Sequence, residues 1–442
     1  MIVFLETLGC SRNQVDSEIM LGKLVANGHS LTDDPSCAQV IIVNTCGFIS
    51  TASDEAVDVI LEMAAFKEKG ICEKLIATGC LAQRYKDDKN LLSTLPEVDA
   101  FLGTAACDQI VAVVESKDIK PLTLFPDPSK RPFQDLCEQR ELSSDAFSYI
   151  KVSEGCNRKC TYCIIPQLRG IQRSRPIDDI CKEAESLVAR GIKEIILTAE
   201  NTTDYGQDFQ DGTGFDQVLS SLAHTLEKEN VWIRFLYTHP TTLTESMIKT
   251  VKQYNSICSY YDVPIQHASS AILKKMGRPY TTEDLYALFK TIREIDPAAA
   301  LRTTIIVGFP GETEQDFDIL MQFIKEVRFD HLGVFTYSDS QDLKSHLLKH
   351  HVPFEIAEKR HDMIMSAQAK LSETKNEQYV GKTVEVLVEE NPEQGVYIGR
   401  TMFQAPEVDG MTFIYSDGLE IGTFVKVRIT DAFEYDIAGV IA

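Results

Sequence analysis

The chain has 442 residues, of which 44% are hydrophobic, and its 66 acidic and 44 basic residues give a formal charge of −22. This length predicts two or three domains with full-sized cores, and the acidity argues against a polyanionic partner unless basic residues gather locally. Twelve cysteines in so long a chain do not indicate a disulfide-stapled mini-domain; their triplets favour metal binding in a reducing compartment. The sequence shows neither a signal-peptide pattern nor an apolar stretch of membrane-spanning length, so we expect a cytoplasmic protein without a membrane partner.

Residues 1–115 alternate between strand and helix patterns. Three apolar runs predict buried parallel strands, and amphipathic helical patterns lie between them. This alternation indicates an α/β fold with an open, doubly wound sheet. The predicted strands are Ile2–Leu8, Val40–Val43 and Leu75–Ala77, and the predicted helices are Ser17–Ala26 and Ser53–Phe66.

A cysteine follows each of these strands: Cys10, Cys46 and Cys80. Because parallel strands end at one edge of a sheet, where such folds place ligands, the three thiols should converge despite their separation in sequence. Gly9 and Gly79 would let the backbone come close to a bulky cofactor. One buried cysteine at a strand end is usually a packing residue, but three at corresponding ends favour an iron–sulfur cluster over core packing.

Residues 116–147 carry a weaker pattern punctuated by prolines, which predicts a linker. Residues 148–377 form a second α/β series, and Pro353–Glu377 at its end predicts one long amphipathic helix packed on a core. Periodicity alone does not separate a partial barrel from a closed one. The six predicted strands are Tyr149–Val152, Glu194–Thr198, Val231–Tyr237, Tyr260–Ile265, Thr303–Val307 and Leu332–Tyr337.

A second cysteine triplet, Cys156, Cys160 and Cys163, has the spacing C-x3-C-x2-C. Three thiolates on one tight loop can hold three irons of a cubane cluster and leave the fourth iron open to a small molecule. The alternative is a zinc knuckle, but structural zinc takes four ligands and the nearest further cysteines, Cys137 and Cys181, are remote in sequence. The sequence therefore predicts a [4Fe–4S] site with an open iron.

The tail, residues 378–442, changes to short alternating strands joined by turns rich in glycine and aspartate, which predicts a small antiparallel β-barrel. It contains 4 basic and 11 acidic residues, a net charge of −7. The predicted strands are Thr383–Val388, Val396–Arg400, Met411–Tyr415 and Thr423–Ile429.

The cysteine loop resembles that of the radical S-adenosylmethionine (SAM) superfamily, and the two triplets with the barrel tail resemble the methylthiotransferases over essentially the whole chain. The resemblance implies a methylthiotransferase domain (1–115), a radical SAM core with a partial (β/α)6 barrel (148–377) and a TRAM-type barrel (378–442). Four stretches are similar to the branch that modifies an aspartate of small-subunit ribosomal protein twelve. They are Asn44–Ile49, Ser153–Cys160, Cys163–Pro166 and Ala405–Gly410.

This resemblance implies two [4Fe–4S] clusters as cofactors, with all six cysteines as catalytic metal ligands. The cluster on Cys156, Cys160 and Cys163 would bind SAM and cleave it reductively to a 5′-deoxyadenosyl radical. The cluster on Cys10, Cys46 and Cys80 would hold the sulfur, which a further SAM methylates before it is joined to carbon. A flavodoxin- or ferredoxin-type reductant and a sulfur donor are implied as partners.

The resemblance also implies SAM contacts at the carboxyl ends of the core strands. Glu200-Asn201 stands where the family more often has Gln-Asp, which puts a side-chain role there in doubt. Glycines such as Gly308 would let the backbone approach adenine. The candidate cofactor-binding residues are Tyr162, Thr198, Glu200, Gln266 and Gly308.

Two other functions stay open. Methylthiolation of a tRNA adenosine would need a basic surface, which the core could supply, but the acidic tail suits a basic ribosomal protein better than tRNA. A non-catalytic electron-transfer or cluster-carrier protein would explain six ligating cysteines but not a barrel with SAM-type loops. The basic residues near the cysteine loop, which we interpret as ordinary charge or cofactor contacts, are Lys151, Arg158, Lys159, Arg169, Arg173 and Arg175.

Overall fold

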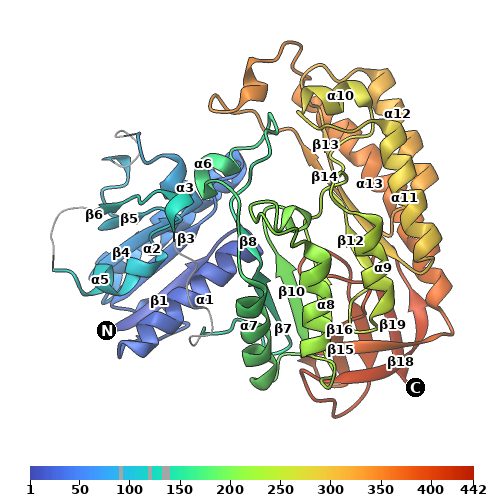
Figure 1. Ribbon diagram of the computed structural model, residues 1–442. Coiled ribbons are helices and arrows are strands. Elements are labelled where there is room, and N and C mark those ends of the chain that lie inside the picture. The colour runs from blue at the N-terminus through green and yellow to red at the C-terminus, as the bar shows by residue number, and fades with distance from the viewer. Residues whose placement is uncertain (89–92, 118–121, 132–139) are drawn as a thin grey trace.

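The computed structural model describes residues 1–88, 93–117, 122–131 and 140–442. It has three parts, an N-terminal α/β domain, a central barrel-like core and a small C-terminal barrel (Figure 1). The N-terminal domain, in blue and cyan, lies beside the core, and the C-terminal barrel, in red, lies at one end of it. No helix in these ranges is both long and apolar enough to cross a membrane.

The N-terminal domain is built on a parallel sheet with the order β2-β1-β3-β4-β5-β6. Ile41 and Val43 pack with helix α2 on one face, whereas Val40 and Ile42 pack with helix α1 on the other. The doubly wound fold is therefore confirmed. Its elements are β1 (Ile2–Thr7), α1 (Ser11–Ala26), β2 (Ser30–Leu31), β3 (Val40–Thr45), α2 (Ser50–Lys69), β4 (Lys74–Gly79), α3 (Cys80–Arg84), β5 (Ala100–Leu102), α5 (Ile110–Glu115) and β6 (Leu122–Leu124).

Two features differ from the sequence expectations. Strand β6 falls within the expected linker yet pairs in parallel with β5, so this sheet extends beyond residue 115. Residues 118–121 and 132–139 of that segment, including Cys137, lie outside the described residues. Helix α1 begins six residues before its predicted start, because Ser11, Asn13 and Asp16 are buried polar residues that hide the amphipathic pattern.

The core holds its six strands in chain order as two parallel three-stranded sheets, β11-β10-β7 and β12-β13-β14. Backbone hydrogen bonds join the sheets, with Cys258 N–H donating to Ile233 and Thr238 N–H donating to Asp262. Among the described residues β7 and β14 form no ladder, so the barrel is partial. The strands are β7 (Phe147–Lys151), β10 (Glu194–Thr198), β11 (Trp232–Phe235), β12 (Tyr260–Asp262), β13 (Ala300–Val307) and β14 (His331–Thr336).

Helices cover the outside of this partial barrel, and the predicted terminal helix is confirmed as α13 (Phe354–Asn376). Gln368 of α13 anchors it by donating to the backbone oxygen of Phe329, 3.0 Å away. Thr281 and Thr313 cap two of the helices by accepting a backbone N–H from the residue three positions later. The other core elements are β8 (Ser153–Glu154), α6 (Ile165–Arg169), β9 (Arg173–Ser174), α7 (Ile177–Ala189), α8 (Phe215–Thr225), α9 (Glu245–Gln253), α10 (Ser270–Lys275), α11 (Thr282–Ile295) and α12 (Glu314–Val327).

The C-terminal domain is a closed five-stranded barrel in the order β15-β16-β17-β19-β18. Sequence analysis missed its last strand, β19, which closes the barrel by pairing antiparallel to β18 and parallel to β17, so one pair departs from the expected antiparallel arrangement. The run Ile-Ala-Gly-Val-Ile has no alternation of polar and apolar residues, so the strand pattern was absent. The strands are β15 (Thr383–Glu393), β16 (Val396–Arg400), β17 (Thr412–Tyr415), β18 (Phe424–Ala432) and β19 (Ile437–Ile441).

This barrel covers the amino-terminal ends of the core strands. Glu194, the first residue of β10, pairs with Arg400 of β16 at 2.5 Å. Tyr260, the first residue of β12, donates its hydroxyl to Asp409 at 2.6 Å. The Ala405–Gly410 stretch therefore attaches the barrel to the core, and the carboxyl-terminal ends of the core strands lie away from it.

Candidate functional site: two cysteine triads

The first triad is assembled from three neighbouring strands of the N-terminal sheet. Cys10, Cys46 and Cys80 follow β1, β3 and β4, which are adjacent in that order, so parallel pairing brings all three to the same sheet edge. The approach is close: a Cβ on Gly9 would lie 2.8 Å from that of Cys46, and Gly9 has φ +97°. Figure 1 shows this edge turned toward the core. We call these residues the dispersed triad.

The second triad lies on one loop after β8 and forms a local triad of Cys156, Cys160 and Cys163. Within the loop, Cys163 N–H donates to the carbonyl of Cys160 at 3.2 Å, and Arg158 N–H donates to the sulfur of Cys156 at 3.4 Å. The loop is held from outside by Thr161, whose N–H donates to the carbonyl of Met276 at 3.0 Å. This loop stands at the carboxyl-terminal end of the core strands, as expected for an α/β ligand site.

The two triads belong to ends of the two domains that face each other. Cys80 packs in one apolar group with Ile164 and Leu168, which directly follow the local triad. Beside it, the hydroxyls of Ser11 and Thr198 lie 3.1 Å apart and share a hydrogen bond. The domain boundary therefore runs between the two sets of cysteines.

The donor set suits clusters better than a single ion. Each triad offers three thiols, whereas structural zinc takes four ligands, and three thiolates are the number that leaves one iron of a cubane cluster open. Burial raises the pKa of Cys80 to about 12 and that of Cys156 to about 11, so these thiols stay protonated until a metal takes the proton's place.

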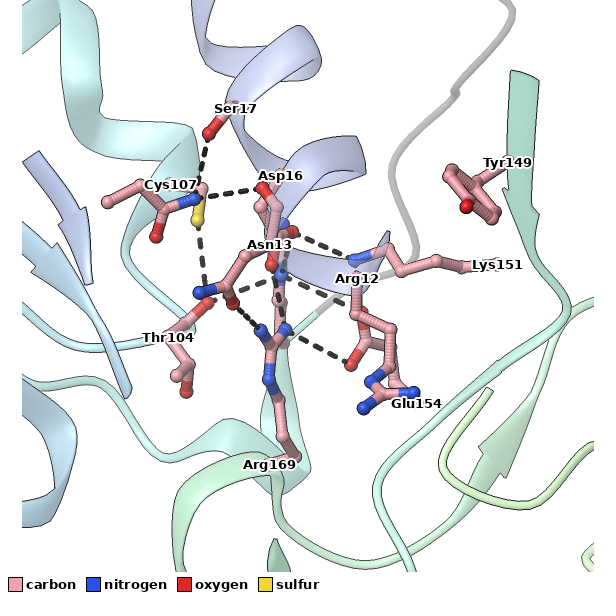
Figure 2. A network of polar contacts seen from close by, with 12 residues as sticks. Arg12, Asn13, Asp16, Ser17, Thr104, Cys107, Tyr149, Lys151, Glu154 and Arg169 are labelled. Atoms are coloured by element: carbon pink, nitrogen blue, oxygen red, sulfur yellow. Dashed lines mark hydrogen bonds and ion pairs between the residues drawn. The ribbon is translucent and has the colours of Figure 1, made fainter. Parts of the chain in front are cut away.

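A buried ionic network lies behind the triads and crosses the domain boundary (Figure 2). Asp16 of α1 is its centre: Arg131, Lys151 and Arg169 lie 3.0, 2.8 and 2.7 Å from its carboxylate oxygens. Burial alone would raise the pKa of Asp16, but these three cations hold it well below its usual range. Glu154 shares all three of these cations, Arg131, Lys151 and Arg169. The network thus joins α1 to the segment that carries the local triad.

Asn13 and Arg169 extend this network to the dispersed triad. The Asn13 amide donates to the backbone oxygens of Leu8 and Thr45 at 2.8 and 3.0 Å, which ties together the turns after β1 and β3. Its side-chain oxygen accepts from Arg169 at 2.6 Å, and Arg169 lies 4.0 Å from the sulfur of Cys80. A positive charge from the core therefore stands beside a cysteine of the N-terminal domain.

Arg84 makes a second link across the boundary, on α3, whose first residue is Cys80. It donates to the backbone oxygen of Gly47 at 2.8 Å and forms a bidentate ion pair with Asp342 in the loop after β14. Its side chain is only 2% exposed. Sequence analysis did not single out Asn13, Asp16 or Arg84, because their burial and their contacts near the cysteines depend on how the two domains pack.

The predicted SAM-contacting residues all lie at the carboxyl-terminal side of the core. Glu200 pairs with Arg12 at 3.1 Å, so it is held by the N-terminal domain, as Thr198 is. Gln266 has φ +66° and bridges to the β13 backbone through Thr304 and Ile306. A Cβ on Gly308 would lie 2.5 Å from the Cβ of Ala357 on α13, which is a packing reason for that glycine. Their contacts with SAM stay predictions.

The hydroxyl of Tyr162, between the second and third cysteines of the local triad, accepts from Arg278 at 2.6 Å. Its ring packs edge-on against Phe309. This fixes the loop from the side of β13 and leaves the backbone of Tyr162 as the predicted adenine contact.

Most basic residues near the local triad are used inside the protein. Lys151 and Arg169 pair with Asp16, Arg175 pairs with Glu183 at 2.7 Å, and Arg158 forms a bidentate pair with Asp204. Arg173 donates to the backbone oxygen of Arg131. These contacts use most of the basic side chains on which the tRNA alternative would depend, whereas Lys159 forms no ion pair in the described structure.

Three family models match the chain in the order of its three parts. A model described as uncharacterized protein family UPF0004 matches residues 2–103, the radical SAM superfamily model matches residues 150–324, and a TRAM domain model matches residues 380–441. The predicted radical SAM core and TRAM-type tail are thereby confirmed.

Among solved structures, the radical SAM methyltransferase TsrM from Kitasatospora setae has a TM-score of 0.55 and 14% identity, covering 75% of this chain and 72% of that one. The cobalamin-dependent SAM radical enzyme OxsB has a TM-score of 0.52 and 14% identity, covering 84% of this chain and 56% of that one. At such low identity these likenesses support the fold alone.

Full-length relatives are much closer. Proteins described as ribosomal protein uS12 methylthiotransferase RimO are 46% identical to this chain in Desulfosudis oleivorans, with 99% of both chains covered, and 46% identical in Clostridioides difficile, with 99% and 98% covered. The relative with the same description in Geobacter sulfurreducens is 40% identical, with 99% and 98% covered. The resemblance to the ribosomal-protein branch is confirmed, and the chain belongs to the ribosomal protein uS12 methylthiotransferase family.

Proposed function

We propose that this chain is a radical SAM methylthiotransferase that adds a methylthio group to the β-carbon of an aspartate on ribosomal protein uS12. The observation that carries the proposal is the pairing of two cysteine triads at facing domain ends, in a chain 46% identical over its length to proteins of that name. An aspartate β-carbon hydrogen is too weakly acidic for the bases that proteins offer, so a radical route is required.

Within this proposal the six cysteines divide by position. Cys156, Cys160 and Cys163 would hold a [4Fe–4S] cluster to which SAM binds, and Cys10, Cys46 and Cys80 would hold a second one. When bound, the clusters and SAM would supply the radical, the sulfur and the methyl group.

The protein's own part is placement. Arg84, Asp16 and Arg169 fix the N-terminal domain against the core, so the two triads keep one separation. The apolar group around Cys80, with Ile164, Leu168 and Leu343, places apolar side chains beside the dispersed triad, where they would help to exclude water. A radical intermediate needs such exclusion to avoid side reactions.

SAM recognition would fall to the carboxyl-terminal ends of the core strands. We propose the backbone of Tyr162, the side chains of Thr198, Glu200 and Gln266, and the backbone of Gly308 as its contacts. The pairing of Glu200 with Arg12 supports a role in which this carboxylate is oriented by the N-terminal domain toward an ammonium group. A flavodoxin- or ferredoxin-type reductant and a sulfur donor would act with the enzyme in the cytoplasm.

The test is a product assay on the full chain, reconstituted anaerobically with iron and sulfide. The protein is incubated with SAM, dithionite and either uS12-containing ribosomal subunits or bulk tRNA, and products are read by mass spectrometry. We expect 5′-deoxyadenosine and a methylthio group on an aspartate of uS12. Modification of tRNA alone would support the tRNA alternative, and absence of 5′-deoxyadenosine would support a cluster carrier.

A further inference from the structure

A group of exposed lysines surrounds one side of the local triad and has no place in the proposed chemistry. We call it the lysine rim. All five side chains are exposed, and in the described structure none forms an ion pair, whereas the chain as a whole carries a charge of −22. The rim consists of Lys159, Lys274, Lys275, Lys344 and Lys349.

Short contacts show that these lysines form one surface although they come from three segments. Thr161, in the cysteine loop with Lys159, donates its hydroxyl to the backbone oxygen of Lys275 at 2.9 Å. The backbone oxygen of Thr161 accepts from Ser345, the neighbour of Lys344, at 2.9 Å. The cysteine loop therefore contacts both of the other segments that carry the lysines of the rim.

The other side of the rim closes through Gly311. Its carbonyl accepts from the Lys275 ammonium at 2.9 Å, and its N–H donates to the backbone oxygen of His350, next to Lys349, at 2.7 Å. Between Lys344 and Lys349 stands Leu347, which is 82% exposed. An exposed apolar residue ringed by unpaired cations is the composition of a docking surface with a polar rim.

Nearby acidic side chains cancel little of this charge. Asp342 is neutralised by Arg84, and Asp339, which accepts from His346 at 2.8 Å and from the hydroxyl of Tyr337 at 2.9 Å, is a single carboxylate beside five lysines. The lysine rim is thus a local positive field on an acidic protein. A basic ribosomal protein would be repelled from it, and an acidic protein would be attracted.

We propose that the lysine rim is the docking surface for an acidic one-electron carrier protein, of the flavodoxin or ferredoxin class, that reduces the cluster held by Cys156, Cys160 and Cys163. This inference rests on the proposed function. One electron leaves the reduced carrier and enters that cluster, and no atom is transferred. Lys159 immediately precedes Cys160, so a carrier seated here stands beside the loop that would hold the cluster. Electron-transfer complexes are typically small, weak and guided by charge, which suits a patch of this size.

The test compares two triple variants with the same change in net charge. Lys274→Glu/Lys344→Glu/Lys349→Glu reverses the rim. Lys182→Glu/Lys228→Glu/Lys370→Glu makes the same change at exposed lysines elsewhere on the core, which also lack ion pairs in the described structure. Both are measured at low and high salt with a purified flavodoxin and a purified two-cluster ferredoxin. The readouts are carrier binding by calorimetry, cluster reduction by stopped-flow absorbance, and dithionite-driven 5′-deoxyadenosine formation.

At low salt we expect the affinity of the rim variant for the carrier, and the rate at which the carrier reduces its cluster, to be at least about tenfold lower than in the wild type. Both differences should shrink at high salt. Its dithionite-driven cleavage of SAM should equal that of the wild type, and the control variant should match the wild type in every readout. Equal losses in both variants would overturn the proposal, as would failure of both carriers to bind the wild type. If the wild type did not cleave SAM with dithionite, the proposed function would be contradicted. The comparison of carrier binding by the two variants would still show whether the lysine rim is the docking surface.

Discussion

The two triads reach similar chemistry by opposite structural routes. The local triad is contained in eight residues, and its geometry depends on one loop held by Thr161 and Tyr162. The dispersed triad needs three strands in register and an edge that is completed by core residues such as Arg169 and Asp342. The local triad should therefore tolerate changes in the domain interface, and the dispersed triad should not. Comparing variants of the two triads therefore distinguishes changes that distort the cysteine loop from changes that disturb the packing of the two domains.

The largest contrast is expected from the cysteines themselves. Cys156→Ala should abolish 5′-deoxyadenosine formation, because two thiolates leave the SAM site without its cluster. Cys46→Ala should keep SAM cleavage but lose methylthio transfer. Both products are measured by liquid chromatography with mass spectrometry, and iron content and circular dichroism serve as controls for folding. Loss of cleavage in both well-folded variants would contradict the division of roles.

Asp16→Asn should give the next largest effect. It leaves three buried cations short of their shared carboxylate, and breaking such an arrangement typically costs about 3–5 kcal/mol of stability. We expect a lower thermal midpoint and loss of iron from the dispersed triad before the local one, measured in a background with Cys156, Cys160 and Cys163 changed to Ala and in the reciprocal background. Asp108→Asn is a matched control, since that carboxylate is more exposed and its ion pair in the described structure is with Lys23.

The same carboxylate gives a pH prediction with a definite sign. Because the pKa of Asp16 is lower in the folded protein than its usual value of about 3.9, the folded state binds fewer protons than the unfolded state as pH falls. Its contribution to stability is therefore present above about pH 4 and is lost progressively below that. Urea unfolding between pH 3 and 6 should show a steeper acid loss in the wild type than in Asp16→Asn; parallel curves would contradict this.

The smallest effect is expected from two glycines, one in each triad's support. Gly79→Ala should strain a residue at φ +97° and bring a Cβ to 2.5 Å from the Asn44 side chain, at a cost of about 1–3 kcal/mol. Gly155→Ala places a Cβ against the carbonyl of Ile171 beside the local triad. The iron content is measured in proteins that keep the cysteines of one triad only. Gly79→Ala should lower the iron bound by the dispersed triad, and Gly155→Ala should lower the iron bound by the local triad. Gly28→Ala, at φ +83° with open space around it, controls for backbone strain alone.

The convergence of the dispersed triad could be predicted because parallel strands have a fixed direction: once three apolar runs were assigned as neighbours, Cys10, Cys46 and Cys80 had to follow them to one edge. The six core strands and α13 were predictable because apolar runs and helical spacing mark them in the sequence. Strand β6 was not, because it has only three residues between prolines, and β19 was not, because its run Ile-Ala-Gly-Val-Ile has no alternation of polar and apolar residues.

The interface around Asp16 could not be predicted either. Ser11, Asn13 and Asp16 look like the exposed start of a helix, and only the packing of α1 against the core makes them buried. Their partners Arg131, Lys151 and Arg169 are more than a hundred residues away. The roles of the six cysteines and the SAM contacts stay predictions until a loaded enzyme is measured.

The position of Asp16 has a practical consequence for building chimeras. The three cations that neutralise it all come from beyond residue 115, one from the connecting segment and two from the core. If the first 115 residues came from a relative that lacks Asp16, the three buried cations of this chain would lose their shared carboxylate. In the reverse graft, Asp16 would be buried without cations wherever the relative lacks them. Exchanges meant to swap substrate preference should therefore carry Asp16 together with the stretch from Arg131 to Arg169.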